Sequence, residues 1–203
     1  MTDQTPKKHI ILASASPRRR EILGGLGADF TVLSADADES SDITSPEDLT
    51  RELARRKGRA VLELLKAKGE DGGAIIISAD TVVACNGEIL GKPTDREDAK
   101  RMLSMLSGNT HTVSTGIAVT YRGVTKTDCS TTLVHVDRIP TAELEKYLDS
   151  GDAYDKAGAY GIQGRFSQWV RGIEGCYFGV VGLPVNRLAA LFYDCVGCYP
   201  DEI

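Results

Sequence analysis

Three consecutive arginines, residues 18–20, stand at the predicted start of a helix and could bind an anion. They follow a stretch typical of a buried strand, residues 10–13, and a short turn. In that turn Ser16 is a suitable N-cap, and Pro17 takes the first helical position. Cations at a helix N-terminus oppose the helix dipole by about 0.3–1 kcal/mol each. An anion bound at the free N–H groups of this helix end therefore explains the arginines better than a solvated basic surface, which stays the alternative.

Lys57 is a cation on the apolar face of a second predicted helix. Ser45 as N-cap, Pro46 and the carboxylates that follow predict a helix from residue 46 to about residue 66. Lys57 lies four residues after Leu53 and four before Val61, so it shares their face. Its side chain either extends to the edge of this face and reaches water, or it needs an anionic partner, because an unpaired buried charge is strongly unfavourable.

Asp80 is a carboxylate inside a predicted buried strand. Residues 74–84 are apolar almost throughout, which predicts a strand covered on both faces. A carboxylate there must be neutral, paired or bound to a metal. Two interpretations follow: a structural salt bridge, or a carboxylate at the end of a buried strand that opens onto a site.

Two further lysines add to the supply of cations. Lys92 lies on a predicted loop and Lys156 in a turn-rich segment, where a lysine is usually only solvated. Together with residues 18–20, however, they place positive charge at the ends of several predicted elements. Such cations, one helix N-terminus and carboxylates able to hold a divalent metal are what a polyphosphate needs. The sequence therefore favours a polyphosphate as ligand.

Predicted strands and helices alternate in the first half of the chain, and a hairpin follows in the middle. The patterns predict strands over 10–13, 30–33 and 74–84, helices over 17–26, 46–66, 94–107, 141–148 and 184–193, and an antiparallel hairpin over 111–120 and 124–137. Residues 154–182 are rich in glycine and aromatic residues, which predicts short strands mixed with turns. This order indicates an α/β fold with one mixed sheet flanked by helices.

Length, charge and composition narrow the class of protein. The chain has 203 residues, of which 41% are hydrophobic, and a formal net charge of −5. This charge argues against bulk binding of nucleic acid. No apolar run approaches the roughly 20 residues that cross a bilayer, and the first residues lack the apolar stretch of a secretory signal. We therefore expect no membrane partner and a cytoplasmic location.

Cys195 and Cys198 have the spacing of a metal-binding or redox pair. The chain holds five cysteines, an odd number, and no second pair accompanies these two. The histidines lie far from them in the sequence. We therefore expect reduced thiols near the C-terminus rather than a zinc site.

A series of ordered segments resembles the Maf family of nucleoside triphosphate pyrophosphatases. The first is LASASPRRREIL at residues 12–23, and the others are LARRK at 53–57, SADTVV at 78–83, GKP at 91–93, LSGNTH at 106–111, DKAGAYGIQG at 155–164 and VGLP at 181–184. The resemblance covers about residues 9–193. It implies one α/β domain over residues 9–194, between tails at 1–8 and 195–203, with a long central cleft similar to that of inosine triphosphate pyrophosphatases.

The resemblance also implies an activity and the residues that perform it. A nucleoside triphosphate is hydrolysed to the monophosphate and pyrophosphate with a divalent cation, Mg²⁺ or Mn²⁺, and the family suggests a homodimer. By its place in the motifs, Asp80 resembles the proton acceptor, and Asp80 and Glu39 resemble ligands of the metal. The residues that would bind the phosphates are Ser16, Arg18, Lys57, Lys92 and Lys156. The residues that would select the base are Arg18, Thr81 and Gln163. We expect these cations to surround the triphosphate while a water held by Asp80 and the metal attacks the α-phosphorus.

Residues 155–164 narrow the expected substrate. Their DKAGAYGIQG form resembles the branch of the family that acts on dTTP and UTP, including modified uridine nucleotides, rather than the branch for 7-methyl-GTP. Residues 165–170, RFSQWV, depart from the small, glycine-containing stretch that is usual there, so Phe166 and Trp169 either line the base pocket or pack. Two other functions stay open: a purine-selective pyrophosphatase, and a non-catalytic nucleotide-binding regulator of cell division.

Overall fold

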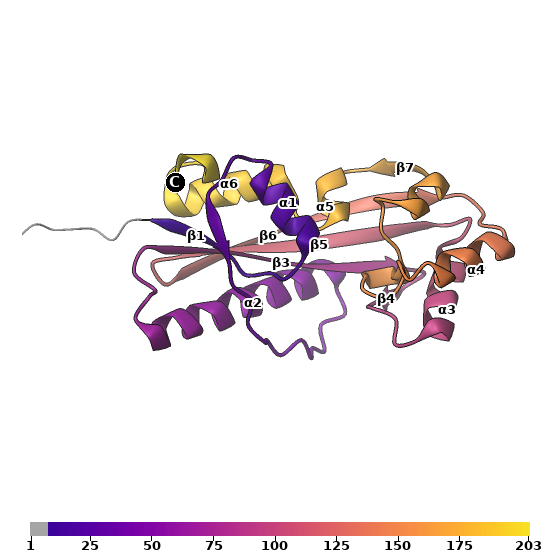
Figure 1. Cartoon of the computed structure of the whole chain (residues 1–203), viewed down its shortest axis with the longest axis horizontal. Helices are drawn as coiled ribbons and strands as arrows, with labels where there is room; N and C mark the ends of the chain where they lie inside the picture. The colour runs from indigo at the N-terminus through magenta and orange to yellow at the C-terminus, as the bar shows by residue number, and fades with distance from the viewer. Residues whose placement is uncertain (1–7) are drawn as a thin grey trace, which may run out of the picture.

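A seven-stranded mixed sheet forms the centre of the protein (Figure 1). The computed structural model describes residues 8–203. The strands lie in the order β2-β1-β3-β5-β6-β7, and β4 pairs with β3. β1 pairs with β2 and β3 in parallel, and the other pairings are antiparallel. This confirms the predicted α/β fold with one mixed sheet flanked by helices.

The elements have the following bounds. The strands are β1 (His9–Leu12), β2 (Phe30–Val32), β3 (Ala74–Cys85), β4 (Glu88–Leu90), β5 (Thr110–Tyr121), β6 (Val124–Val136) and β7 (Val170–Glu174). The α-helices are α1 (Pro17–Gly24), α2 (Pro46–Lys68), α3 (Arg96–Leu106), α4 (Thr141–Asp149), α5 (Tyr177–Val181) and α6 (Val185–Val196). Short 3-10 helices are η1 (Ala157–Ala159), η2 (Arg165–Trp169) and η3 (Pro200–Glu202).

Local signals explain most of these bounds. α2 begins after Ser45, whose side chain accepts a hydrogen bond from the Asp48 N–H, and ends at Gly69, which has a φ of 70° that glycine adopts without strain. The predicted hairpin is present as β5 and β6. Some bounds differ from the prediction: β4 was not expected, α1 ends at Gly24 rather than residue 26, α3 begins at Arg96 rather than residue 94, and α6 extends to Val196.

The long strands β3, β5 and β6 carry helices on both faces (Figure 1). α2 covers one face, and α1, α5 and α6 lie on the other. Gly116 of β5 allows α2 to come close, because a Cβ atom there would lie 2.2 Å from the backbone carbonyl carbon of Thr50. This approach places Lys57, about two turns after Thr50, against the sheet.

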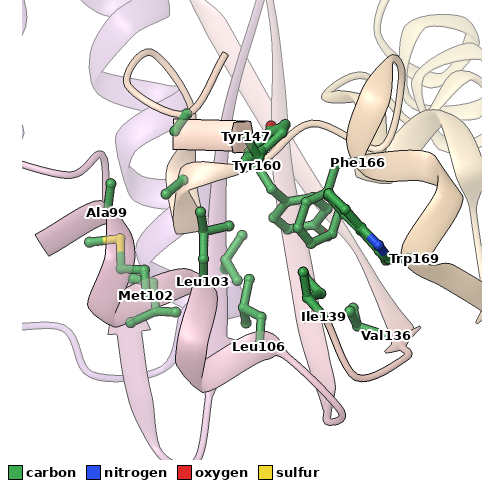
Figure 2. Packing of buried hydrophobic residues seen from close by; sticks show 14 of the residues in the cluster. Ala99, Met102, Leu103, Leu106, Val136, Ile139, Tyr147, Tyr160, Phe166 and Trp169 are labelled. Atoms are coloured by element: carbon green, nitrogen blue, oxygen red, sulfur yellow. The ribbon is translucent and has the colours of Figure 1, made fainter. Parts of the chain in front are cut away.

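Aromatic side chains fill the core beside α3 and α4 (Figure 2). The ring centroids of Tyr160 and Phe166 lie 4.4 Å apart, and those of Tyr147 and Trp169 lie 6.0 Å apart in an edge-to-face arrangement. Phe166 and Trp169 are both buried in this cluster. Of the two alternatives for the unusual segment 165–170, packing is therefore the one that the fold adopts.

The two chain ends were predicted to be tails. Residues 1–7 of the predicted N-terminal tail lie outside the described residues. In the predicted C-terminal tail, Cys195, Val196, Cys198 and Ile203 pack against the core cluster that contains Phe192. Cys195 and Cys198 are free thiols. The division of the chain into domain and tails stays a prediction. Among the described residues, no helix is both long and apolar enough to cross a membrane.

Candidate active site

One edge of β3 is open between two short partner strands. β1 pairs with β3 as far as Ile77, and β4 pairs with it from Val83 onward. Between them, no other strand of residues 8–203 covers residues 78–82 on this edge, while β5 pairs with the opposite edge. Asp80 and Thr81 lie in this gap. Because successive side chains of a strand point to opposite faces, Asp80 faces α2 and Thr81 faces α1 and α5.

Asp80 and Glu39 share the ammonium group of Lys57. The Lys57 Nζ atom lies 2.5 Å from Asp80 Oδ1 and 2.9 Å from Glu39 Oε1. Only 11% of the Asp80 side chain and 21% of the Lys57 side chain are exposed, compared with 61% of the Glu39 side chain. Of the two alternatives for Lys57, the structure therefore adopts the one in which its ammonium group has anionic partners. A salt bridge alone does not distinguish the two interpretations of Asp80, but this one opens to solvent on the Glu39 side.

Arg19 connects α1 to the opposite face of the same strand. Its Nε atom donates to the Gly182 carbonyl at 2.8 Å, Nη1 to Ser14 Oγ at 3.3 Å, and Nη2 to Thr81 Oγ1 at 3.1 Å. Burial lowers the pKa of the Arg19 guanidinium, and Asp80 opposes this effect. An arginine stays charged under these conditions, so Arg19 supplies a fixed positive charge behind Thr81.

Arg18 points to a different neighbour, the segment that precedes η1. Its Nη1 atom lies 3.6 Å from Asp155 Oδ2, and the other oxygen of Asp155 lies 2.5 Å from Lys156 Nζ. The backbone N–H of Gly158 donates to the carbonyl of Gly91 at 3.0 Å, which joins this segment to the loop that carries Lys92. The fold therefore brings Arg18 and Lys156 together at Asp155, beside the Lys92 loop.

The remaining predicted residues have simpler surroundings. Ser16 caps α1, since its side chain accepts from the Arg19 backbone N–H at 3.5 Å. Lys92 and Gln163 are exposed on loops. For a metal, Asp80 and Glu39 are the two predicted carboxylates that converge on one point, the Lys57 ammonium. The described part of the chain holds no group of three or more histidine, cysteine or acidic side chains able to bind a metal.

Comparison with known proteins decides the family. The family model described as Maf-like protein matches residues 9–195. The chain belongs to the Maf family. A relative from Agathobacter rectalis named dTTP/UTP pyrophosphatase is 46% identical over 191 residues, which are 88% of this chain and 93% of that protein. A relative of the same name from Hahella chejuensis is 42% identical over 196 residues, 96% of each chain.

A solved structure with a similar chain path is the Ham1 protein of Staphylococcus aureus. It shares 17% sequence identity and a TM-score of 0.46, over 64% of this chain and 72% of that chain.

In this member of the Maf family, sequence reasoning missed two side chains that support the site. Arg19 was treated only as one of three helix-start cations, and the sequence offered no sign that it, rather than Arg18, reaches Thr81. Thr115 of β5 bonds to Thr81, with 2.8 Å between the two Oγ1 atoms. No comparable signal marked Thr115, because its strand is rich in threonine and serine, whereas Asp80 stands in a strand that is apolar almost throughout.

Proposed function

We propose that this protein hydrolyses dTTP and UTP to the nucleoside monophosphate and pyrophosphate. The reaction breaks a phosphoric anhydride bond. It would serve a house-cleaning role, in which modified pyrimidine nucleotides are also substrates. The group formed by Asp80, Lys57 and Glu39 at the open edge of β3 carries this proposal. It is supported by relatives that are 42–46% identical and are named dTTP/UTP pyrophosphatase. Buried opposite charges that open to solvent beside a strand edge suit a charged ligand that arrives from solution.

The triphosphate would be held by cations from several elements. Lys57 approaches from α2, Arg18 from the first turn of α1, and Lys92 and Lys156 from the two loops joined at Gly158. At the start of α1 the backbone N–H of Arg18 adds one donor, since Pro17 has no N–H and the N–H groups of Arg19 and Arg20 bond to Ser16. A hydrogen bond to a charged group is worth about 1.5–3 kcal/mol, so a few such contacts suffice to bind a tetra-anion. Affinity would then come mainly from the phosphates.

Asp80 would accept a hydrogen bond from the attacking water and direct it to the α-phosphorus. The carboxylate of Asp80 is held by its 2.5 Å contact with the Lys57 ammonium, and only 8% of the surface of Asp80 is exposed. A fixed carboxylate keeps its acceptor oxygen in one place, which is what orientation of a nucleophile requires. Asp80 is therefore proposed as the catalytic proton acceptor.

A divalent cation fits the two carboxylates of this group. Asp80 and Glu39 already converge on a positive charge, and Mg²⁺ is commonly bound by one or two carboxylates together with substrate phosphates. When bound, Mg²⁺ or Mn²⁺ would neutralise phosphate charge and polarise the reacting oxygen. Asp80 and Glu39 are the residues proposed to hold it.

The base would be selected by Arg18, Thr81 and Gln163. Thr81 is partly exposed in the β3 gap, and Gln163 offers an exposed amide with a donor and an acceptor. The homodimer and the cytoplasmic location implied by the resemblance are also part of this proposal. Sedimentation of the purified protein tests the first, and fractionation of cells tests the second.

A panel of nucleotides tests the activity directly. The purified protein is incubated with dTTP, UTP, CTP, 7-methyl-GTP and inosine triphosphate, with and without Mg²⁺ or Mn²⁺, and the products are separated by chromatography. We expect UMP or dTMP and pyrophosphate as products, dependence on the metal, and loss of turnover in Asp80→Asn. Preference for 7-methyl-GTP would favour the purine-selective alternative. Binding of nucleotides without hydrolysis would favour the regulator.

A further inference from the structure

The hydroxyl group of Thr81 belongs to a chain of hydrogen bonds that starts at Arg19 and ends at a backbone carbonyl. Arg19 Nη2 donates to Thr81 Oγ1 at 3.1 Å. Thr81 Oγ1 lies 2.8 Å from Thr115 Oγ1, which in turn donates to the carbonyl oxygen of Gly179 at 2.8 Å. Both ends of this chain have a fixed polarity, because a guanidinium can only donate and a carbonyl can only accept.

The fixed ends determine the direction of the middle hydrogen bond. A threonine hydroxyl has one proton and two lone pairs. The single proton of Thr115 goes to Gly179, so Thr115 can offer Thr81 only a lone pair. Thr81 must therefore donate its proton to Thr115, and one of its lone pairs is already occupied by Arg19. What Thr81 retains for a ligand is one lone pair.

Thr81 is placed to use that lone pair. It lies in the open stretch of the β3 edge, directly after Asp80. Thr81 is partly exposed, whereas the flanking Asp80 and Val82 are buried. Thr115 is completely buried, so it can affect a ligand only through Thr81.

We propose that Thr115 is a positioning residue for base selection, which fixes Thr81 as a hydrogen-bond acceptor and thereby favours bases with a ring N–H over bases with an unprotonated ring nitrogen. The inference rests on the proposed function. Uracil and thymine carry a proton on N3, whereas N3 of cytosine is an acceptor and would face the lone pair of Thr81. Two opposed acceptors leave both groups unpaired, which is how a polar site rejects a substrate of nearly identical size. UTP and dTTP would thus be separated from CTP and dCTP.

Removal of the Thr115 hydroxyl tests the inference. In Thr115→Val the side chain keeps its shape, but Thr81 loses the acceptor for its proton and can turn the proton toward a ligand. We expect the ratio of kcat/KM for UTP to kcat/KM for CTP to fall by about tenfold or more, with CTP hydrolysis retained better than UTP hydrolysis. Thr115→Ser keeps the hydroxyl and should restore the wild-type ratio.

A matched control lies on the same strand. Thr120 is also buried and its hydroxyl pairs with that of Thr125 at 2.8 Å, so Thr120→Val removes the same chemical group from the same sheet at a distance from Thr81. Its UTP-to-CTP ratio should equal that of the wild type. Melting temperatures show whether each variant folds, and Thr115→Ala makes the same prediction if Thr115→Val does not.

The outcomes separate the inference from the proposed function. A wild-type enzyme that hydrolyses UTP and dTTP but shows the same ratio in Thr115→Val would overturn the inference and leave the function intact. Equal hydrolysis of CTP and UTP by the wild type would also overturn it. If the wild type hydrolyses neither UTP nor dTTP, the proposed function itself fails.

Discussion

Replacement of each partner in the Lys57–Asp80 pair should affect stability and turnover in opposite order. Lys57→Met keeps the length of the side chain but removes the ammonium partner of Asp80. Asp80 is only 8% exposed, so its carboxylate would then be buried without a partner. Asp80→Asn keeps an acceptor oxygen near Lys57 and leaves the lysine with Glu39 at 2.9 Å. The first change strands a buried charge, and the second does not.

The expected magnitudes follow from this difference. Loss of one partner from a fully buried pair costs about 3–5 kcal/mol, and the partial exposure of Lys57 and Glu39 reduces this to about 2–3 kcal/mol for Lys57→Met. Asp80→Asn should lower the free energy of unfolding by only about 1 kcal/mol. The double variant should lose at least about 0.5 kcal/mol less than the sum, since the second change removes the stranded charge.

Turnover should respond in the reverse order to stability. Asp80→Asn should lower kcat by at least about 100-fold, the low end for loss of a general base. Lys57→Met should act mainly on affinity for the triphosphate and raise KM.

Urea unfolding followed by the fluorescence of Trp169, together with steady-state kinetics on UTP, measures both quantities. Lys126→Met is a matched control, because its pair with Asp194 is exposed and its removal should cost less than about 1 kcal/mol. If Lys57→Met were as stable as the wild type, the charge of Asp80 would be solvated and the reasoning would fail. Near-normal turnover of Asp80→Asn would reduce Asp80 to a structural salt bridge.

Three further predictions concern packing, pH and metal. Gly116→Ala should lower the free energy of unfolding by at least about 3 kcal/mol, because the new Cβ would lie 2.2 Å from the backbone of α2. Melting curves measure this, and Gly172→Ala is the control, because a Cβ at Gly172 would meet open space. Burial lowers the pKa of His111 to about 4 from 6.5, so the unfolded state binds the proton more readily. Stability should therefore decline by about 3 kcal/mol as pH falls from about 6.5 to 4, and urea unfolding of His111→Gln should lack this part of the decline. Chelation by EDTA should abolish UTP hydrolysis, and added Mg²⁺ or Mn²⁺ should restore it.

Each of these has a result that contradicts it. Equal melting temperatures for the Gly116 and Gly172 variants would mean that α2 moves freely away from the sheet. Identical pH dependence of stability in His111→Gln and the wild type would place the His111 titration elsewhere. Full activity in EDTA would exclude Asp80 and Glu39 as ligands of a required metal.

Local sequence signals predicted much of the fold. The Ser45–Pro46 start of α2 and the alternating strands of the β5–β6 hairpin were found because each signal lies within the element that it marks. β4 was missed because it has three residues and exists through its pairing with residues 83–85 of β3. The packing of Phe166 and Trp169 was also undecided, since an aromatic residue in a turn-rich segment suits a pocket as well as a core.

The candidate site was predictable in its components and not in its connections. Lys57 and Asp80 stood out as charges on faces that periodicity assigns to the interior, and the structure joins them at 2.5 Å. Glu39, in a polar loop, was predicted beside Asp80 only through the family resemblance, and no local pattern indicates that it completes the group. Loop residues carry no periodicity, so their partners depend on how the flanking elements dock.

Hydrophobic periodicity and the penalty for an unpaired buried charge are properties of local stretches of chain. Which elements form and which charges need partners could therefore be predicted from the residues alone. Which groups meet depends on how those elements dock. Consecutive side chains of a helix point about 100° apart, so the docking of α1 selects Arg19 for Thr81 and Arg18 for Asp155. The open edge at residues 78–82 likewise depends on where β1 ends and β4 begins along β3, which is set by pairing between distant segments.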